Sequence, residues 1–317
     1  MTNWGIVSTI KAPLNQIAGF AAHHLDLGAH RIFIYLDDGD EAMRTALNAH
    51  PKLRVTLCDA AYWNKRKRAR PDKHQPRQTA NAAHAYRRAG DVDWLAHIDV
   101  DEFLLPATPA EPDFAAQLAT LPQDATCARL RPVEALANPD GTAPQYFKAC
   151  AINRAQRLKQ TAQVYPGWGA AMNGGFLSHV QGKMVYRTGL DGLQARIHNI
   201  FVDGAENPGQ QELPDMTLLH YHAANFDGFY KHFAYRHAQG SYRAELKPNR
   251  PEAEGGLSAH QLFAQIMAEG GKPLLQQFFT EVCTATPALT AVLDRHGLLR
   301  HHHIHPASAA KRHFPHI

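Results

Sequence analysis

The chain has 317 residues, of which 44% are hydrophobic, and a formal net charge of +4 at pH 7. This hydrophobic content is enough for a packed core in one large domain or two smaller ones, so the composition excludes a disordered chain. No apolar run approaches the ~18 residues of a membrane span, no signal-peptide pattern opens the chain, and the four scattered cysteines indicate neither zinc nor a disulfide framework.

The first hundred residues alternate between strand and helix patterns. Strands are predicted over residues 4–10, 31–36, 53–57 and 94–99, and helices over 14–27, 41–49 and 77–89. Strand–helix alternation of this kind predicts a parallel sheet with right-handed crossovers, flanked by helices. We therefore expect a Rossmann-like α/β fold.

The second half of the chain is less regular. We predict a helix over 113–121, strands over 126–133, 183–187 and 218–222, and helices over 226–239, 273–279 and 287–296. Ser258 and Gln261 form a capping-box pattern at the start of one more helix. The C-terminal tail is therefore expected to be helical, and the histidine run at 301–305 is assigned no role.

Positive charge is concentrated between residues 64 and 77, which hold seven basic residues and one acid. The rest of the chain is slightly acidic, so no nucleic-acid partner is expected. Five cations within Lys65–Arg70 require an exposed loop. We interpret it either as a contact for an anionic acceptor at a membrane surface or as a solvated loop.

Acidic residues follow two of the predicted strands. Asp37 and Asp38 come after the second strand, and Asp99 and Asp101 after the fourth. The carboxyl ends of parallel strands meet at one edge of a sheet, where ligands bind. Asp99 and Asp101 would point the same way in extended backbone, and two carboxylates there suit Mg²⁺ or Mn²⁺ holding a phosphate. The alternative is a solvated acidic turn.

Several motifs occur together in order between Trp4 and Phe233. They are Trp94–Leu104 with its D-x-D-E-F run, His23-His24 before Gly28, Asp37–Asp40, Arg77-Gln78 with Asn81, Lys183 with Arg187, His198, and His220-Tyr221. This ordered set resembles bacterial glycosyltransferase family 2-like proteins of the D-x-D-E-F branch. Lys11-Ala12-Pro13 departs from the Lys-Asn-Glu usual in that family, and His222-Ala223-Ala224 departs from its later motif.

The resemblance implies a GT-A fold, with a catalytic domain over residues 1–240 and a helical extension over 241–317. It implies a hexosyltransferase-like enzyme that takes an NDP-sugar, UDP-sugar as first choice, and a glycan or lipid-linked acceptor with the help of Mn²⁺ or Mg²⁺. An inverting reaction is expected, with a retaining one as the alternative. The setting would be cytoplasmic, with peripheral contact at the inner face of an anionic membrane.

Individual roles follow from the resemblance. The metal ligands would be Asp99, Asp101 and His220, although a histidine on a strand is also a common core residue. The donor-binding residues would be Thr9, Lys11, Asp37, Asp38, Arg77, Gln78, Asn81, Asp99 and Lys183. Asp101 would also be catalytic, and Glu134, Asp191 and Asp203 are candidates for the general base that an inverting reaction needs.

Two other functions remain open from the residues alone. A nucleotidyltransferase also places carboxylates and a metal on a nucleotide-binding sheet, but Ile10–Pro13 lacks a Gly-rich phosphate loop. A non-catalytic sugar- or anion-binding module would use the basic loop, bind in a salt-dependent manner and need no metal.

Overall fold

The computed structural model describes residues 2–317 apart from 67–68, 109–112, 246–247 and 249–255. The chain divides into two compact units. Unit one comprises Met1–Arg131, Gln181–Leu218 and Ile304–Ile317, and unit two comprises Pro132–Val180 and Leu219–His303. The predicted boundary at residue 240 follows the family resemblance and stays a prediction.

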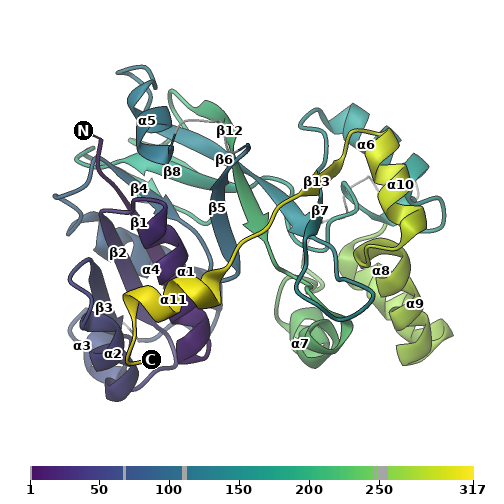
Figure 1. The fold of residues 1–317 in the computed structure, drawn as a ribbon, viewed down its shortest axis with the longest axis horizontal. Helices are drawn as coiled ribbons and strands as arrows, with labels where there is room; N and C mark the ends of the chain where they lie inside the picture. The colour runs from purple at the N-terminus through teal and green to yellow at the C-terminus, as the bar shows by residue number, and fades with distance from the viewer. Residues whose placement is uncertain (1, 67–68, 109–112, 246–247, 249–255) are drawn as a thin grey trace. The chain divides into compact units, whose positions relative to one another are not determined.

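Four parallel strands form the centre of unit one. They are β1 (Trp4–Ile10), β2 (Arg31–Leu36), β3 (Leu53–Leu57) and β4 (Trp94–His97), in the order β4-β1-β2-β3 (Figure 1). Every residue of β1 and β4 is buried, as expected for a parallel sheet covered on both faces. The parallel register sets Ile10 opposite Leu36 and Val7 opposite His97, so three strands end at one edge of the sheet.

Antiparallel strands extend this centre. β8 (Lys183–Arg187) pairs with β4, and β6 (Cys127–Ala135) pairs with β8. β5 (Glu102–Pro106) pairs with β12 (Gln211–His220), while β9 (Gln194–Ala195), β10 (Ile200–Val202) and β11 (Ala205–Glu206) form a separate small sheet. The predicted α/β class is confirmed, with a sheet that is parallel at its centre and mixed beyond it.

Six helices of the described part of unit one surround the sheet. They are α1 (Leu14–Asp26), α2 (Glu41–Asn48), α3 (Ala60–Asn64), α4 (His74–Tyr86), α5 (Phe114–Ala119) and α11 (Pro306–His313). Helix α4 begins three residues earlier than predicted because Pro76 is tolerated in a first helical turn. The C-terminal α11 packs on α1, where Arg312 and His313 bind Asp26.

Unit two is built mainly from helices. Its elements are β7 (Tyr146–Lys148), α6 (Arg154–Val164), a 3₁₀ turn at Gly169–Ala171, α7 (Phe226–Ala238), α8 (Ala259–Glu269), α9 (Gly271–Cys283), α10 (Pro287–Arg295) and β13 (Leu299–His301). Aromatic side chains of α7, α8 and α9, such as Phe229, Phe263 and Phe278, fill its core. The predicted capping box is confirmed, since Ser258 and Gln261 satisfy each other's backbone N–H groups.

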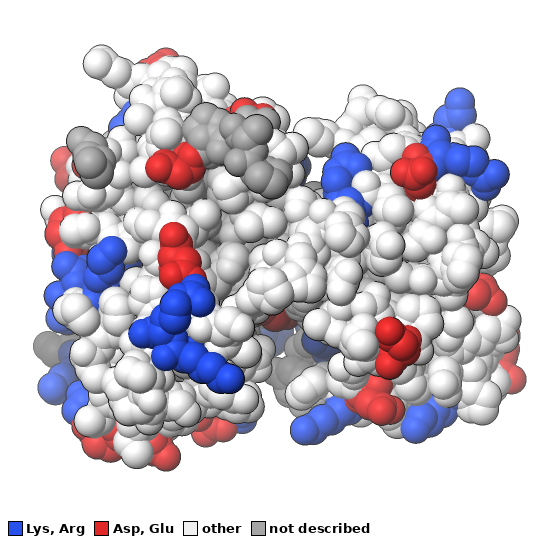
Figure 2. Space-filling view, viewed as in Figure 1, with Lys and Arg blue, Asp and Glu red and all other residues white. Residues whose placement is uncertain are grey.

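Charge is distributed without large patches of one sign on the face drawn in Figure 2, where basic side chains lie among acidic ones. Within the described residues, none of the helices has the length and apolar character needed to cross a membrane. Two of the six positions of the predicted basic loop, residues 67 and 68, lie outside the described residues.

Candidate functional site

The acidic stretch after β4 forms a tight turn. β4 ends at His97, and the chain then turns into β5 with the Glu102 N–H donating to the Asp99 carbonyl oxygen at 3.0 Å. In return, the Asp99 N–H donates to the Glu102 carboxylate at 2.8 Å. The expectation that Asp99 and Asp101 share one side of an extended segment is therefore wrong. Asp101 lies in the turn itself and is half-buried.

A buried lysine neutralises this turn. The Lys183 ammonium lies 2.6 Å from Asp99 and 3.4 Å from Glu102, and the lysine is only 1% exposed. Burial by itself would raise the pKa of Asp99, but Lys183 outweighs it and holds that pKa well below its ordinary value. This geometry favours Lys183 as the residue that holds Asp99, over the direct contact with the donor that we expected.

Helix α4 joins three strand ends through its buried face. Its side-chain contacts run from Arg77 to Asp37 after β2, from Gln78 to Asp99 after β4, and from Asn81 to Thr9 in β1. The three helix residues are spaced i, i+1 and i+4, so they lie on adjacent positions of one face. Several residues that we predicted to bind the donor come from motifs far apart in the sequence. The structure brings them together, and they contact one another directly.

Asp37 is the most enclosed of these carboxylates, with a side chain that is 1% exposed. It accepts from Arg77 at 2.8 Å and from Arg70 at 3.1 Å, and His74 lies 3.7 Å away. Burial alone would raise the pKa of Asp37, but His74 and the two arginines lower it. Asp37 therefore fixes the end of the basic loop against the sheet, which leaves Asp38 as the exposed acid of this pair.

Lys11 and Asp38 form an exposed ion pair of 2.8 Å beside this edge. Asp40 caps α2 by accepting from the Met43 N–H, so this acid of the turn has a structural role. Both Lys11 and Asp38 line a pocket of about 590 Å³ at the carboxyl ends of β1 to β3. Cys58, Asp59, Trp63 and Arg70 complete the main lining of that pocket.

The His23-His24 pair of α1 fixes strand β5. His23 Nε2 is hydrogen-bonded to the Leu104 carbonyl oxygen at 2.7 Å, and the Leu104 N–H donates to His24 Nε2 at 3.2 Å. Burial lowers the pKa of both histidines, which keeps them neutral and lets His24 accept. This motif therefore supports the strand that follows Asp101, and its role is in positioning.

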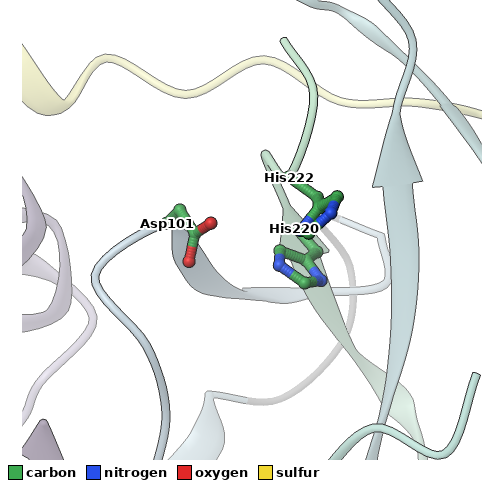
Figure 3. A group of neighbouring side chains, drawn as sticks. All are labelled: Asp101, His220 and His222. Atoms are coloured by element: carbon green, nitrogen blue, oxygen red, sulfur yellow. The ribbon is translucent and has the colours of Figure 1, made fainter. Parts of the chain in front are cut away.

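Unit two contributes a group of histidines. The rings of His220 and His222 lie 5.3 Å apart, and the ring of His179 lies 5.4 Å from His220. His222 Nε2 is hydrogen-bonded to the Tyr242 hydroxyl at 2.8 Å. Figure 3 shows His220 at the end of β12 with His222 just beyond it, and also shows Asp101 of unit one in its turn. Imidazole nitrogen is a type of ligand that transition metals accept in proteins.

The candidates for a general base differ in exposure. Glu134 is 1% exposed, pairs with Lys148 at 3.2 Å and accepts from the Leu177 and Ser178 N–H groups. These contacts occupy both oxygens and argue against proton abstraction by Glu134. Asp203, by contrast, is exposed in the β10–β11 turn, with a φ of 50°.

Sequence reasoning missed four residues that the structure places at or beside this edge. Arg70 and His74 reach Asp37, Trp63 lines the pocket, and Tyr62 donates to the Asn81 carboxamide oxygen. Arg70 was hidden within the basic loop, whose density of charge suggested solvent exposure. The short helix α3, which carries Tyr62 and Trp63, has too few residues for a periodic pattern to reveal it.

The fold and this edge define a mixed α/β protein with a carboxylate-rich site at the ends of parallel strands. Residues 8–128 match the model of Glycosyltransferase family 92. That span includes the whole set from Thr9 to Asp101, and the match supports a glycosyltransferase. The family that matches is therefore family 92, in place of the family 2-like group that the motifs resemble.

Other comparisons are more distant. No curated protein matches the chain. A solved structure described as a mycobacterial protein is similar over 62% of this chain and 58% of its own, at 12% identity and a TM-score of 0.32. HddC from Yersinia pseudotuberculosis is similar over 46% of this chain and 68% of its own, at 11% identity and a TM-score of 0.27. The chain thus spans less than two thirds of the mycobacterial protein.

Proposed function

We propose that the chain is a metal-dependent glycosyltransferase of GT-A type, which moves a sugar from an NDP-sugar, UDP-sugar as first choice, to a glycan or lipid-linked acceptor. The observation that carries the proposal is the carboxyl edge of β4-β1-β2-β3. There, the pocket beside Asp38 and the turn that holds Asp101 both fall within the segment that matches Glycosyltransferase family 92. Ligands of open α/β sheets bind at this edge.

The pocket of about 590 Å³ suits the nucleoside of such a donor. Trp63 and Cys58 supply apolar lining, while Asp38 and Lys11 supply exposed polar groups. Asp37 is held by Arg77 and Arg70, so we assign it to shaping the pocket and assign contact with the ribose or base to Asp38. Thr9 and Asn81 form the inner support of the same edge through their hydrogen bond of 3.0 Å.

The next question is whether the side chains expected to bind the metal suit a divalent cation. Gln78 and Lys183 each bind one oxygen of Asp99, so Asp99 fits a positioning role better than the direct ligation that we expected. Asp101, half-buried in the turn, fits as a carboxylate ligand of unit one. His220 of unit two remains the nitrogen ligand that the family resemblance implies, and Mn²⁺ accepts such a ligand more readily than Mg²⁺ does. When bound, the cation supplies charge that neutralises the leaving diphosphate.

The remaining steps fall to other residues of this chain. Lys183 keeps Asp99 ionised and fixed, and Gln78 orients it. If the reaction is inverting, we propose exposed Asp203 as the base that accepts the acceptor's proton. The acceptor would be a glycan, and a lipid-linked one would bring the protein to an anionic membrane surface.

A donor-hydrolysis screen tests the proposal. Purified protein is incubated with a panel of NDP-sugars in Mn²⁺, Mg²⁺ or EDTA, and released NDP is measured. We expect one donor to be hydrolysed with Mn²⁺ and none in EDTA. Release of NDP at equal rates in EDTA would contradict the metal dependence. Formation of NTP and sugar 1-phosphate from the NDP-sugar when inorganic pyrophosphate is added would indicate a nucleotidyltransferase.

Asp101→Asn is the matched variant, because it keeps the side-chain size and removes one charge. Loss of charge stabilisation in the transition state typically lowers turnover by ~10²–10³-fold, and we expect a loss of that order. The control is Asp294→Asn, which removes the same charge from an exposed position in α10 of unit two. An Asp101→Asn protein that melts normally and keeps full Mn²⁺-dependent UDP binding, measured by calorimetry, would exclude Asp101 as the ligand.

A further inference from the structure

Unit one contains a second pocket on the opposite side of α3. Ala60, Trp63 and Asn64 line the donor pocket proposed above, whereas Ala61, Tyr62 and Lys65 line the second one. The second pocket has a volume of about 500 Å³ and lies beside β3, the last strand of the parallel sheet. Neither the family match nor the proposed transfer reaction assigns it a ligand.

The lining of this pocket is strongly cationic. Its basic residues are Arg44, Lys65, Arg66, Arg87 and Arg88, and its acids are Glu41 and Asp59. Both acids are already engaged, since Glu41 binds Arg44 and Asp59 caps α3 by accepting from the Tyr62 N–H. The other four cations make no ion pair with a described residue, so the pocket carries an excess of positive charge.

Arg66 gives a second, independent indication that this pocket suits an anion. Its guanidinium stacks on the Tyr62 ring at 4.0 Å, and one terminal nitrogen donates to the Ala80 carbonyl oxygen at 3.4 Å. The other terminal nitrogen, Nη2, is buried and has no hydrogen-bond partner among the described residues. Buried donors of this kind are normally satisfied, so this one points to an acceptor supplied by a ligand.

The surroundings of His84 agree with an unneutralised positive field. His84 Nδ1 is hydrogen-bonded to the Tyr35 hydroxyl at 2.6 Å, in the wall of the pocket. Burial, together with Arg66, Arg88 and Arg87, lowers the pKa of His84 to about 4. His84 is therefore neutral near pH 7, and the positive charge of the pocket comes from lysine and arginine alone.

We propose that this pocket binds a small ligand that carries phosphate with at least two negative charges. The planar guanidinium groups of Arg66, Arg87 and Arg88 match phosphate oxygens, and a single carboxylate would leave most of the excess charge unbalanced. A hollow of this size receives a compact anion better than the flat surface of a bilayer. The site shares only Asp59 with the lining of the donor pocket and needs no metal, so it stands apart from the proposed function.

Calorimetric titration with inorganic pyrophosphate in EDTA tests this site. Arg87→Gln with Arg88→Gln is the test variant, because both side chains are exposed at the end of α4 and their loss should leave the fold intact. We expect saturable binding to the wild type that weakens at least about tenfold in this variant. The control, Arg295→Gln with Lys311→Gln, removes the same charge at exposed positions elsewhere and should bind as the wild type does.

Three results would overturn the proposal. The first is that the wild type shows no saturable binding of pyrophosphate. The second is an equal loss of affinity in both double variants, which would indicate a response to net charge alone. Alternatively, phosphatidylglycerol vesicles would bind in an Arg87- and Arg88-dependent manner while pyrophosphate did not, which would assign the residues to a membrane surface. None of these measurements depends on glycosyl transfer, so they are independent of the proposed function.

Discussion

In the described part of each unit a buried lysine pairs with a carboxylate, and the two lysines, Lys183 and Lys148, have different roles. In unit one, Lys183 binds Asp99, whose side chain is 29% exposed, and Glu102, which is fully buried. In unit two, Lys148 faces Glu134 across the antiparallel pair β6–β7, and both side chains are at most 1% exposed. The first cluster is thus open to solvent through Asp99, whereas the second is closed.

The remaining contacts of the two clusters explain the difference. Lys148 also donates to the carbonyl oxygens of Gly175 and Val282, and Glu134 accepts from two backbone N–H groups. That cluster joins backbone segments that are far apart in the chain, which is a structural task. Lys183 instead holds the carboxylate of Asp99, two residues from Asp101. A lysine–carboxylate ion pair therefore stabilises the fold of unit two, whereas a similar pair in unit one positions a candidate site.

Lys148→Met should have the largest effect on stability. It leaves the Glu134 carboxylate buried without its cation, and removing one partner of a buried pair typically costs about 3–5 kcal/mol. We expect a loss of that size in urea denaturation, with unchanged UDP affinity for the protein that remains folded. Cys283, whose pKa burial raises to about 12, lies 3.8 Å from Lys148 and supplies no replacement charge.

The double variant Lys148→Met with Glu134→Gln sharpens this test. It removes both charges together, so it should be more stable than Lys148→Met alone, with a coupling energy that a double-mutant cycle measures. A cycle in which the two single losses simply add would show that the pair contributes nothing as a pair.

Lys183→Met should destabilise less and impair the site more. Asp99 is partly solvated, so leaving it and Glu102 without the lysine should cost roughly 1–3 kcal/mol. Asp99 would lose its fixed orientation, and we expect Mn²⁺-dependent UDP binding to fall sharply in calorimetry. Lys148→Met, compared at equal folded concentration, is the matched control. If Lys183→Met binds UDP as tightly as that control does, the division of roles between the clusters is refuted.

Much of the fold of unit one could be predicted because its strands carry strong local signals. The runs at Ile6–Ile10 and Ile32–Leu36 are mostly apolar and rich in β-formers, and both runs are buried, as such a pattern predicts. Helix α6 was missed because only Thr161 and Val164 of its residues are buried, so no apolar stripe marks it. The short strand β13 is missed for a similar reason, since its three residues carry no pattern.

The placement of several candidate residues could be predicted from the sequence better than their contacts. The motifs placed Arg77, Gln78 and Asn81 near the strand ends, and the structure confirms that placement. The partners of Lys183 lie more than 80 positions earlier in the chain, so spacing along the sequence gives no sign that its ammonium is neutralised. The sequence around Glu134 likewise gave no reason to exclude it as a general base. Its partner Lys148 becomes a neighbour only when β6 and β7 pair.

Gln78→Leu should have a smaller effect than either lysine variant. Gln78 donates one hydrogen bond to Asp99, which keeps its ion pair with Lys183 in the variant. Losing a hydrogen bond to a charged group typically costs about 1.5–3 kcal/mol, and solvent access to Asp99 should bring the loss to about 1 kcal/mol. Thermal denaturation gives the stability, and titration with UDP gives the effect on the site. Gln277→Leu, on an exposed face of α9, is the control. A loss of stability as large as that of Lys183→Met would mean that Gln78, and not the lysine, holds Asp99.

The smallest expected effect lies in the acid dependence of stability. Burial alone would raise the pKa of Glu134, but Lys148 and the hydrogen bonds from Ser178 and Leu177 lower it below its ordinary value of 4.5. Its contribution to folding is therefore complete above that value and is lost as the pH falls through the lowered pKa, with a slope of at most about 1.4 kcal/mol per pH unit. Glu134→Gln should remove this slope just below pH 4.5. Asp99→Asn should remove a slope that begins below the ordinary Asp value of 3.8, because Lys183 lowers the pKa of Asp99 in the folded protein. Urea denaturation of the three proteins between about pH 3 and 6 measures both slopes. If stability changes with pH equally in the wild type and in Glu134→Gln, the Glu134 carboxylate has the same pKa in the folded and unfolded chains. That result would contradict its assignment to a closed ion pair.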